Sequence, residues 1–130
     1  MQNRAIETTN APAAFGTYSQ AVQCDNTLYL SGVLGIEPGS GELREGLIPQ
    51  IEQLFANMRG VVEAAGGTMA DIVKLQVILT DINYAASVNQ VMSTCFSPPY
   101  PARATFQVVA LPKGALVEVD SIAVLSRKAA

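Results

Sequence analysis

The stretch from Pro49 to Ala65 carries the clearest periodic pattern in the chain and limits the fold most strongly. Apolar residues recur there at spacings of three and four, and the charged residues fall elsewhere on the helical wheel. Pro49 suits the first turn of a helix, and Gly66-Gly67 suits its end. The pattern therefore predicts one long amphipathic helix that packs one face on a sheet.

The segments around this helix alternate between strand and helix patterns and predict an α+β fold. Asp25-Asn26 is a turn signal for an early hairpin, and Asp81 or Asn83 is expected to cap a second helix. "LPKG" (111–114) is expected to turn between the last two strands, giving a second hairpin. The expected elements are a short strand within 3–9, strands at 21–24 and 27–31, the helix at 49–65, a central strand within 71–81, a helix at about 84–96, and strands at about 104–109 and 115–125.

The size and polarity of the chain predict one domain, residues 1–130, with a surface covered by other subunits. The sequence is 49% hydrophobic and only 15% charged, so it can build a core but has little charge for a small monomer's surface. Two helices suffice to cover one sheet face. The strands carry apolar residues on both faces, which favours an oligomer in which sheets from several subunits meet.

The charge pattern disfavours nucleic-acid binding, since the net charge is −3 and the eight Lys and Arg residues are scattered. No segment has the length of a membrane span, and the polar start of the chain is typical of a cytoplasmic protein.

Cys24 and Cys95 form no CxxC motif and are expected to be buried thiols. Histidine is absent, which excludes Ser-His and Cys-His catalysis and His-ligated metals. The chemistry must then use carboxylate, Arg, Lys, Tyr, hydroxyl or backbone groups, or water.

Two charged residues near the C-terminus are candidates for that chemistry. Glu118 alternates with apolar residues in a strand, so it is either solvated on an open sheet face or buried as an acid that holds water. Arg103 follows three prolines in "SPPYPARATF" (97–106), at the expected mouth of a strand. It is either an ordinary surface arginine or a two-point binder of a carboxylate. If the two residues lie on neighbouring strands, they form a small site for an anion and a water.

Further residues could line such a site. Tyr18, in "GTYSQAV", either packs at the edge of the core or presents its hydroxyl to a ligand. Ser31-Gly32 falls at a strand end, where glycine lets a ligand approach the backbone.

Together these segments resemble the RidA/YjgF family of small enamine and imine deaminases. The match is carried by "APAAFGTYSQAV" (11–22), "YLSGVLGIEPGSGEL" (29–43), "EAAGGTMADIVKLQVILTD" (63–81), "VNQV" (88–91) and "PYPARATFQVVALPKGALVEVDSIAV" (99–124). The resemblance implies a chorismate-mutase-like sandwich, with a mixed sheet covered on one face by two helices. It also implies a homotrimer with a central barrel-like core and ligand sites in the clefts between subunits.

The same resemblance implies roles for individual residues. Arg103 would bind the substrate carboxylate and Glu118 would position the attacking water, with no metal or cofactor. The pocket would be lined by Tyr18, Ser31, Gly32, Asn89 and Thr105. Three positions depart from the usual family pattern: Thr105 replaces a common cysteine, Thr17 a proline and Met92 an aromatic residue. A cysteine nucleophile is therefore not available at position 105, and the Thr105 backbone amide is left to bind a carboxylate.

The function implied is hydrolysis of 2-enamino or 2-imino acids, such as 2-aminoacrylate and 2-iminopropanoate, to 2-keto acids and ammonia. The alternatives are a trimeric, non-enzymatic binder of small carboxylates and a pathway-specific deaminase of the same family. A ribonuclease or translation inhibitor fits poorly with a negative, histidine-free chain.

Overall fold

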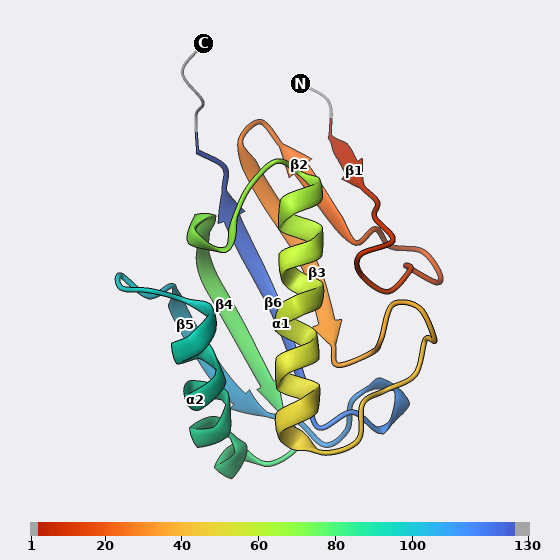
Figure 1. Ribbon diagram of the computed structural model, residues 1–130, viewed down its shortest axis with the longest axis vertical. Helices are drawn as coiled ribbons and strands as arrows, with labels where there is room; N and C mark the ends of the chain where they lie inside the picture. Colours follow the sequence, from red (N-terminus) through yellow and green to blue (C-terminus); the bar gives the residue numbers. More distant parts are fainter. Residues whose placement is uncertain (1–2, 127–130) are drawn as a thin grey trace.

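The computed structural model describes residues 3–126 and shows one six-stranded sheet with both α-helices packed on the same face (Figure 1). The strand order is β1-β2-β3-β6-β4-β5, and all neighbours are antiparallel except β4 and β5. The predictions of an α+β fold and a mixed sheet are confirmed. The elements are β1 (Arg4–Ile6), β2 (Ala21–Cys24), β3 (Thr27–Leu34), α1 (Leu47–Ala64), β4 (Ile72–Leu79), α2 (Ala85–Cys95), β5 (Ala102–Gln107) and β6 (Val117–Val124), with short 3-10 turns at Met69–Asp71, Ile82–Tyr84 and Pro112–Gly114.

Helix α1 begins two residues before Pro49 and packs across β3 and β6. Its apolar stripe is fully buried, with Ile51, Leu54 and Met58 at 0% exposure. The helix stops where Gly66 takes a left-handed conformation with φ of 90°. The apolar stripe in the sequence therefore identified the main packing surface correctly.

Strand β6 lies between β3 and β4, so the C-terminal hairpin expected across "LPKG" does not form. Alternate β6 residues Val117, Val119 and Ala123 are completely buried beneath the helices, which explains why this strand occupies the centre. Strand β5 instead pairs with β4 in parallel, and α2 makes the crossover between them.

The segment after β4 sets the position of α2 and β5. The Asp81 carboxylate accepts a hydrogen bond of 2.9 Å from the Asn83 amide and caps the 3-10 turn Ile82–Tyr84. Helix α2 itself begins after Tyr84 without a side-chain cap, so the cap expected for this helix acts on the turn before it instead. Strand β5 begins at Ala102, two residues earlier than expected, which places Arg103 inside the strand rather than before it.

The sheet face opposite the helices remains partly apolar in the single chain. Register places Tyr29, Ile122 and Ile78 on this face, together with Phe106 and Val124. Tyr29 is 51% exposed, and Phe106 and Val124 are each 40% exposed. We call this surface the open face.

Two smaller predictions can be compared with the described residues. Cys24 and Cys95 are half-buried and not disulfide-bonded, so the expectation of buried thiols is met only in part. Across residues 3–126, none of the helices combines the length and hydropathy that a membrane crossing requires.

Candidate active site

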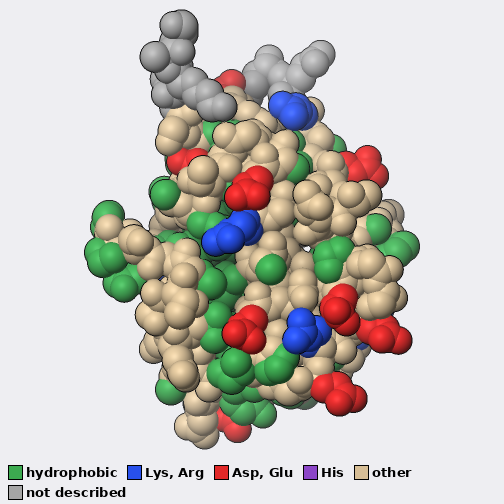
Figure 2. Space-filling model, viewed as in Figure 1, with side chains coloured by type: hydrophobic (Ala, Val, Ile, Leu, Met, Phe, Trp, Pro, Cys, Tyr) green, Lys and Arg blue, Asp and Glu red, His purple; other side chains and the backbone are tan. Residues whose placement is uncertain are grey.

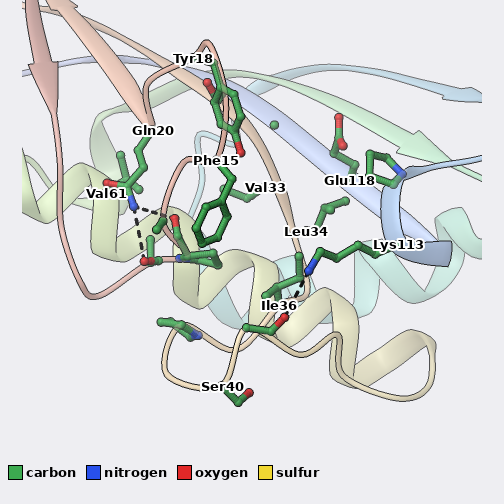
Figure 3. Close-up of a pocket in the computed structure, with 18 of the residues that line it drawn as sticks. Phe15, Tyr18, Gln20, Val33, Leu34, Ile36, Ser40, Val61, Lys113 and Glu118 are labelled. Carbon is green, nitrogen blue, oxygen red and sulfur yellow. Dashed lines mark hydrogen bonds between the residues drawn. The ribbon is translucent and has the colours of Figure 1, made fainter.

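A pocket of about 860 Å³ opens beside the ends of β3 and β6. Figure 3 shows Phe15 and Tyr18 on one side of it and Glu118 and Lys113 on the other. This volume lies within the range of roughly 300–1,000 Å³ that is usual for small-molecule sites. The walls are mostly apolar and include Val33, Leu34 and Ile36.

Glu118 supplies the pocket's carboxyl group from the middle sheet strand β6. Because β6 alternates, Glu118 points to the open face while Val117 and Val119 point to the core. Burial raises the pKa of the Glu118 carboxyl, and the nearby charge of Asp120 raises it further. Glu118 therefore lies on the open sheet face, as one sequence interpretation had it, but is half-buried there rather than fully solvated.

Ser31, Gly32 and Tyr18 line the same pocket as Glu118. The Ser31 hydroxyl donates a 2.6 Å hydrogen bond to the carbonyl of Ser19, so it is committed to the loop before β2. Tyr18 is 56% exposed at the pocket. Gly32 lies directly against the Glu118 side chain.

Arg103, Asn89 and Thr105 form a second cluster between α2 and β5. The Nε atom of Arg103 donates to Thr105 Oγ1 at 2.8 Å, and Nη1 donates to Asn89 Oδ1 at 2.6 Å and to Met92 Sδ at 3.4 Å. Burial lowers the pKa of Arg103. None of the hydrogen bonds found for Arg103 within residues 3–126 goes to a carboxylate. The guanidinium is therefore held in place without its charge being neutralised.

The structure does not bring Arg103 and Glu118 together within one chain. They were expected on neighbouring strands, but β4 lies between β5 and β6. Arg103 pairs with the buried Leu75, whereas Glu118 pairs with Ile78 of the open face. Cross-strand partners share a face, so the two side chains point to opposite faces of the sheet. The candidate residues thus form two half-sites, which we call the Glu118 half-site and the Arg103 half-site.

Sequence reasoning missed three residues that shape the Glu118 half-site. The buried Gln20 amide donates to the carbonyls of Thr8 and Pro12 at 3.0 and 2.7 Å, which fixes one pocket wall. Phe15 is 81% exposed yet lines the pocket, and Lys113 brings a cation to it. The buried Gln20 and the positive φ of Lys113 gave no signal in the sequence pattern, because both depend on how the loops fold together.

Comparison with known proteins identifies the family. The family model described as "Endoribonuclease L-PSP" matches residues 8–125. A mouse protein named 2-iminobutanoate/2-iminopropanoate deaminase is 45% identical over 122 residues, which is 93% of this chain and 90% of the mouse protein. A human protein of the same name is 43% identical over 122 residues and is covered over 89% of its length. The chain belongs to the RidA/YjgF family.

Solved structures agree with this assignment. RidA from the Antarctic bacterium Psychrobacter sp. superposes with a TM-score of 0.92 at 52% identity, covering 94% of this chain and 99% of that one. E. coli TdcF with bound serine superposes with a TM-score of 0.90 at 36% identity, covering 95% and 99% respectively. The resemblance stated from the sequence motifs is confirmed.

Proposed function

We propose that this protein hydrolyses 2-imino acids, formed from 2-enamino acids, to 2-keto acids and ammonia. The observation that carries the proposal is the pair of half-sites, one with a fixed cation for a carboxylate and one with a half-buried acid beside an apolar pocket. The names of the mouse and human relatives support the reaction and the small size of the substrate.

The two half-sites meet, in this proposal, between two copies of the chain in a homotrimer. The Arg103 and Glu118 side chains leave opposite faces of the sheet, so one chain cannot present both to a small substrate. The open face carries exposed Tyr29, Phe106 and Val124, whose burial against neighbouring copies is favourable by about 25 cal/mol per Å² of apolar area. Three such sheets would form the central core of a chorismate-mutase-like assembly.

The chemistry assigned to the site is addition of water to a C=N bond. Arg103 and the Thr105 backbone amide bind the substrate carboxylate, and Asn89 and Thr105 Oγ1 hold the guanidinium. Glu118 accepts a hydrogen bond from the water and takes its proton as the C–O bond forms at C2. Glu118 returns this proton to the imine nitrogen, which gives a carbinolamine with OH and NH2 on C2. The hydroxyl proton then passes to nitrogen as the C–N bond breaks, so ammonia leaves, the C=O bond forms and the 2-keto acid remains. Imines hydrolyse in water unaided, so orientation of the water is sufficient and the reaction needs no cofactor.

Subunit complementation tests the proposal directly. With the imine generated in situ, Arg103→Ala is expected to abolish acceleration of 2-iminopropanoate breakdown, and Glu118→Gln is expected to leave only a small but measurable residual rate. Each mixed trimer refolded from equal amounts of the two variants contains one intact site, so the mixture should recover roughly a quarter of wild-type activity. Recovery would place the half-sites on different copies. Full activity in either single variant would contradict the catalytic assignment, and a mixed trimer without activity would contradict the shared site.

A second candidate is a non-enzymatic binder of small carboxylates, which the serine-bound TdcF relative favours. Such a protein would bind a 2-keto acid or serine but leave the rate of imine breakdown unchanged. The family description raises a third, ribonuclease activity. Figure 2 argues against it, because Lys and Arg are dispersed singly among acidic residues on the helix-covered face, and the chain has no histidine.

A further inference from the structure

The contact between Gly32 and Glu118 carries an inference that rests on the proposed function and deepens it. A Cβ atom built on Gly32 would lie 2.5 Å from Glu118 Oε2, 2.8 Å from Cδ and 3.1 Å from Cγ. We infer that Gly32 is a positioning residue, whose missing side chain leaves the space in which the Glu118 carboxylate must lie to hold the attacking water.

A β-bulge in β3 creates this contact. Leu30 pairs with Ser121 and Val33 pairs with Val119. Between these two pairs β3 therefore advances by three residues while β6 advances by two. The additional residue falls at Ser31-Gly32, beside the pocket. Bulges re-aim the chain next to functional sites, and this one brings the β3 backbone against the Glu118 side chain.

The bulge is held from its other side, so it cannot easily move away from Glu118. The Ser31 hydroxyl donates to the Ser19 carbonyl at 2.6 Å, and the Ser31 amide donates to the Gln20 carbonyl at 3.0 Å. The far end of Glu118 is the freer partner, because it ends in a rotatable carboxyl group at a pocket wall. An added methyl group at position 32 would therefore displace the carboxylate rather than the backbone.

The backbone conformation at position 32 does not itself require glycine. Its φ lies outside the left-handed range, in which five other glycines of the described chain are found. Alanine can adopt this conformation, so the substitution acts through the contact with Glu118 and not through backbone strain. The effect should appear in catalysis and not in folding.

The test compares Gly32→Ala, Glu118→Gln and the double variant with Gly67→Ala as a matched control. A Cβ at Gly67 would lie 2.6 Å from Leu125 Cδ2 and 2.9 Å from Asp71 Oδ2, outside the residues that line the pocket. Gly32→Ala should lower kcat on the order of 100-fold, the effect expected of a misplacement of about 1 Å, while KM and Tm change little. Gly67→Ala should lower Tm and leave kcat unchanged.

Two further measurements separate a positioning role from a structural one. Gly32→Ala should cause no additional loss of kcat in the Glu118→Gln background, because the carboxylate that it displaces is already absent. A crystal structure of Gly32→Ala should show the Glu118 carboxylate moved from its wild-type place. Wild-type kcat in Gly32→Ala, an additive loss in the double variant, or an unmoved carboxylate would each overturn the inference. A fully active Glu118→Gln protein would instead overturn the proposed function, and the crystal structure would still report on the contact.

Discussion

The Nη1 atom of Arg103 donates a 2.6 Å hydrogen bond to Oδ1 of Asn89, across the gap between β5 and α2. Together with the 2.8 Å bond from Nε to Thr105 Oγ1, it fixes the plane of the guanidinium from two directions. Both partners are uncharged, so they orient the cation without neutralising it. An anionic ligand would find the guanidinium already aimed, and little side-chain entropy would be lost on binding.

Replacement of Arg103 by lysine should therefore not preserve activity. Lysine keeps the charge but has a single ammonium group, which cannot bond to Asn89 and Thr105 and also grip a carboxylate in two-point fashion. Loss of one charge-assisted hydrogen bond of about 1.5–3 kcal/mol predicts a fall in kcat/KM of roughly 10- to 150-fold for Arg103→Lys. Steady-state kinetics with 2-iminopropanoate measure it, and kcat/KM within twofold of wild type, about 0.4 kcal/mol, would contradict two-point binding.

Asn89→Ala should raise KM with little change in kcat, because the guanidinium loses one support but keeps its charge and Thr105. Loss of a hydrogen bond of about 1–2 kcal/mol corresponds to roughly a 5- to 30-fold higher KM. Gln90→Ala is the matched control, since Gln90 is the next residue on α2, is also exposed and makes no side-chain bond to Arg103. Equal KM values for the two variants would show that the bond to Asn89 does not assist binding.

The raised pKa of Glu118 predicts the pH dependence of the reaction. The ionised carboxylate is the form that holds and deprotonates water, so activity falls as the pH drops through this pKa. Since burial and then Asp120 raise it, the acidic limb of kcat/KM should lie at higher pH than an ordinary glutamate would give. Asp120→Asn removes the like charge and should move the limb to lower pH, although burial, the larger cause, remains.

Glu52→Gln is the control for the Asp120→Asn experiment, because it removes one negative charge from the exposed face of α1. Its acidic limb should coincide with that of the wild type. A limb that stays in place in Asp120→Asn, or that moves equally in both variants, would show that Asp120 does not act on Glu118.

The elements of this fold were predictable wherever local pattern and burial agree. The apolar stripe of α1 and the alternation of β6 identified the core, because one face of each element is buried and the other face is more exposed. The position of β6 between β3 and β4 was not predictable, since a short turn such as "LPKG" is equally compatible with a hairpin and with strand insertion. Burial of Val117 and Val119 decides it, and burial depends on the whole sheet.

The candidate site was predictable only as a set of residues. Family motifs named Arg103 and Glu118, but the intervening β4 and the opposite directions of their side chains are consequences of strand order. The Thr105 side chain shows the same limit. The sequence predicted only that its backbone amide binds a carboxylate. The structure shows in addition that its hydroxyl accepts a hydrogen bond from Arg103.

Asn57 provides a test of how the pocket wall is held. It is completely buried in α1, and its amide donates to the carbonyls of Leu34 and Ile36 at 3.0 and 2.8 Å, where the chain leaves β3. Asn57→Ala leaves both buried carbonyls without this donor, so it should lower the free energy of unfolding by about 2–3 kcal/mol. The better helix propensity of alanine offsets roughly 0.5 kcal/mol of that loss. Urea denaturation at fixed protein concentration measures the change.

Gln53→Ala is the control for Asn57→Ala, because Gln53 is one turn earlier on α1 and only half-buried. Its Nε2 donates to Asn57 Oδ1 at 2.9 Å, so it supports Asn57 without contacting the pocket wall. Its loss should lower stability by about 1 kcal/mol, because the buried Asn57 Oδ1 loses its donor, which is less than the loss of both carbonyl bonds. Equal destabilisation by the two substitutions would mean that the bonds to Leu34 and Ile36 contribute nothing, and that the segment after β3 is held by apolar packing alone.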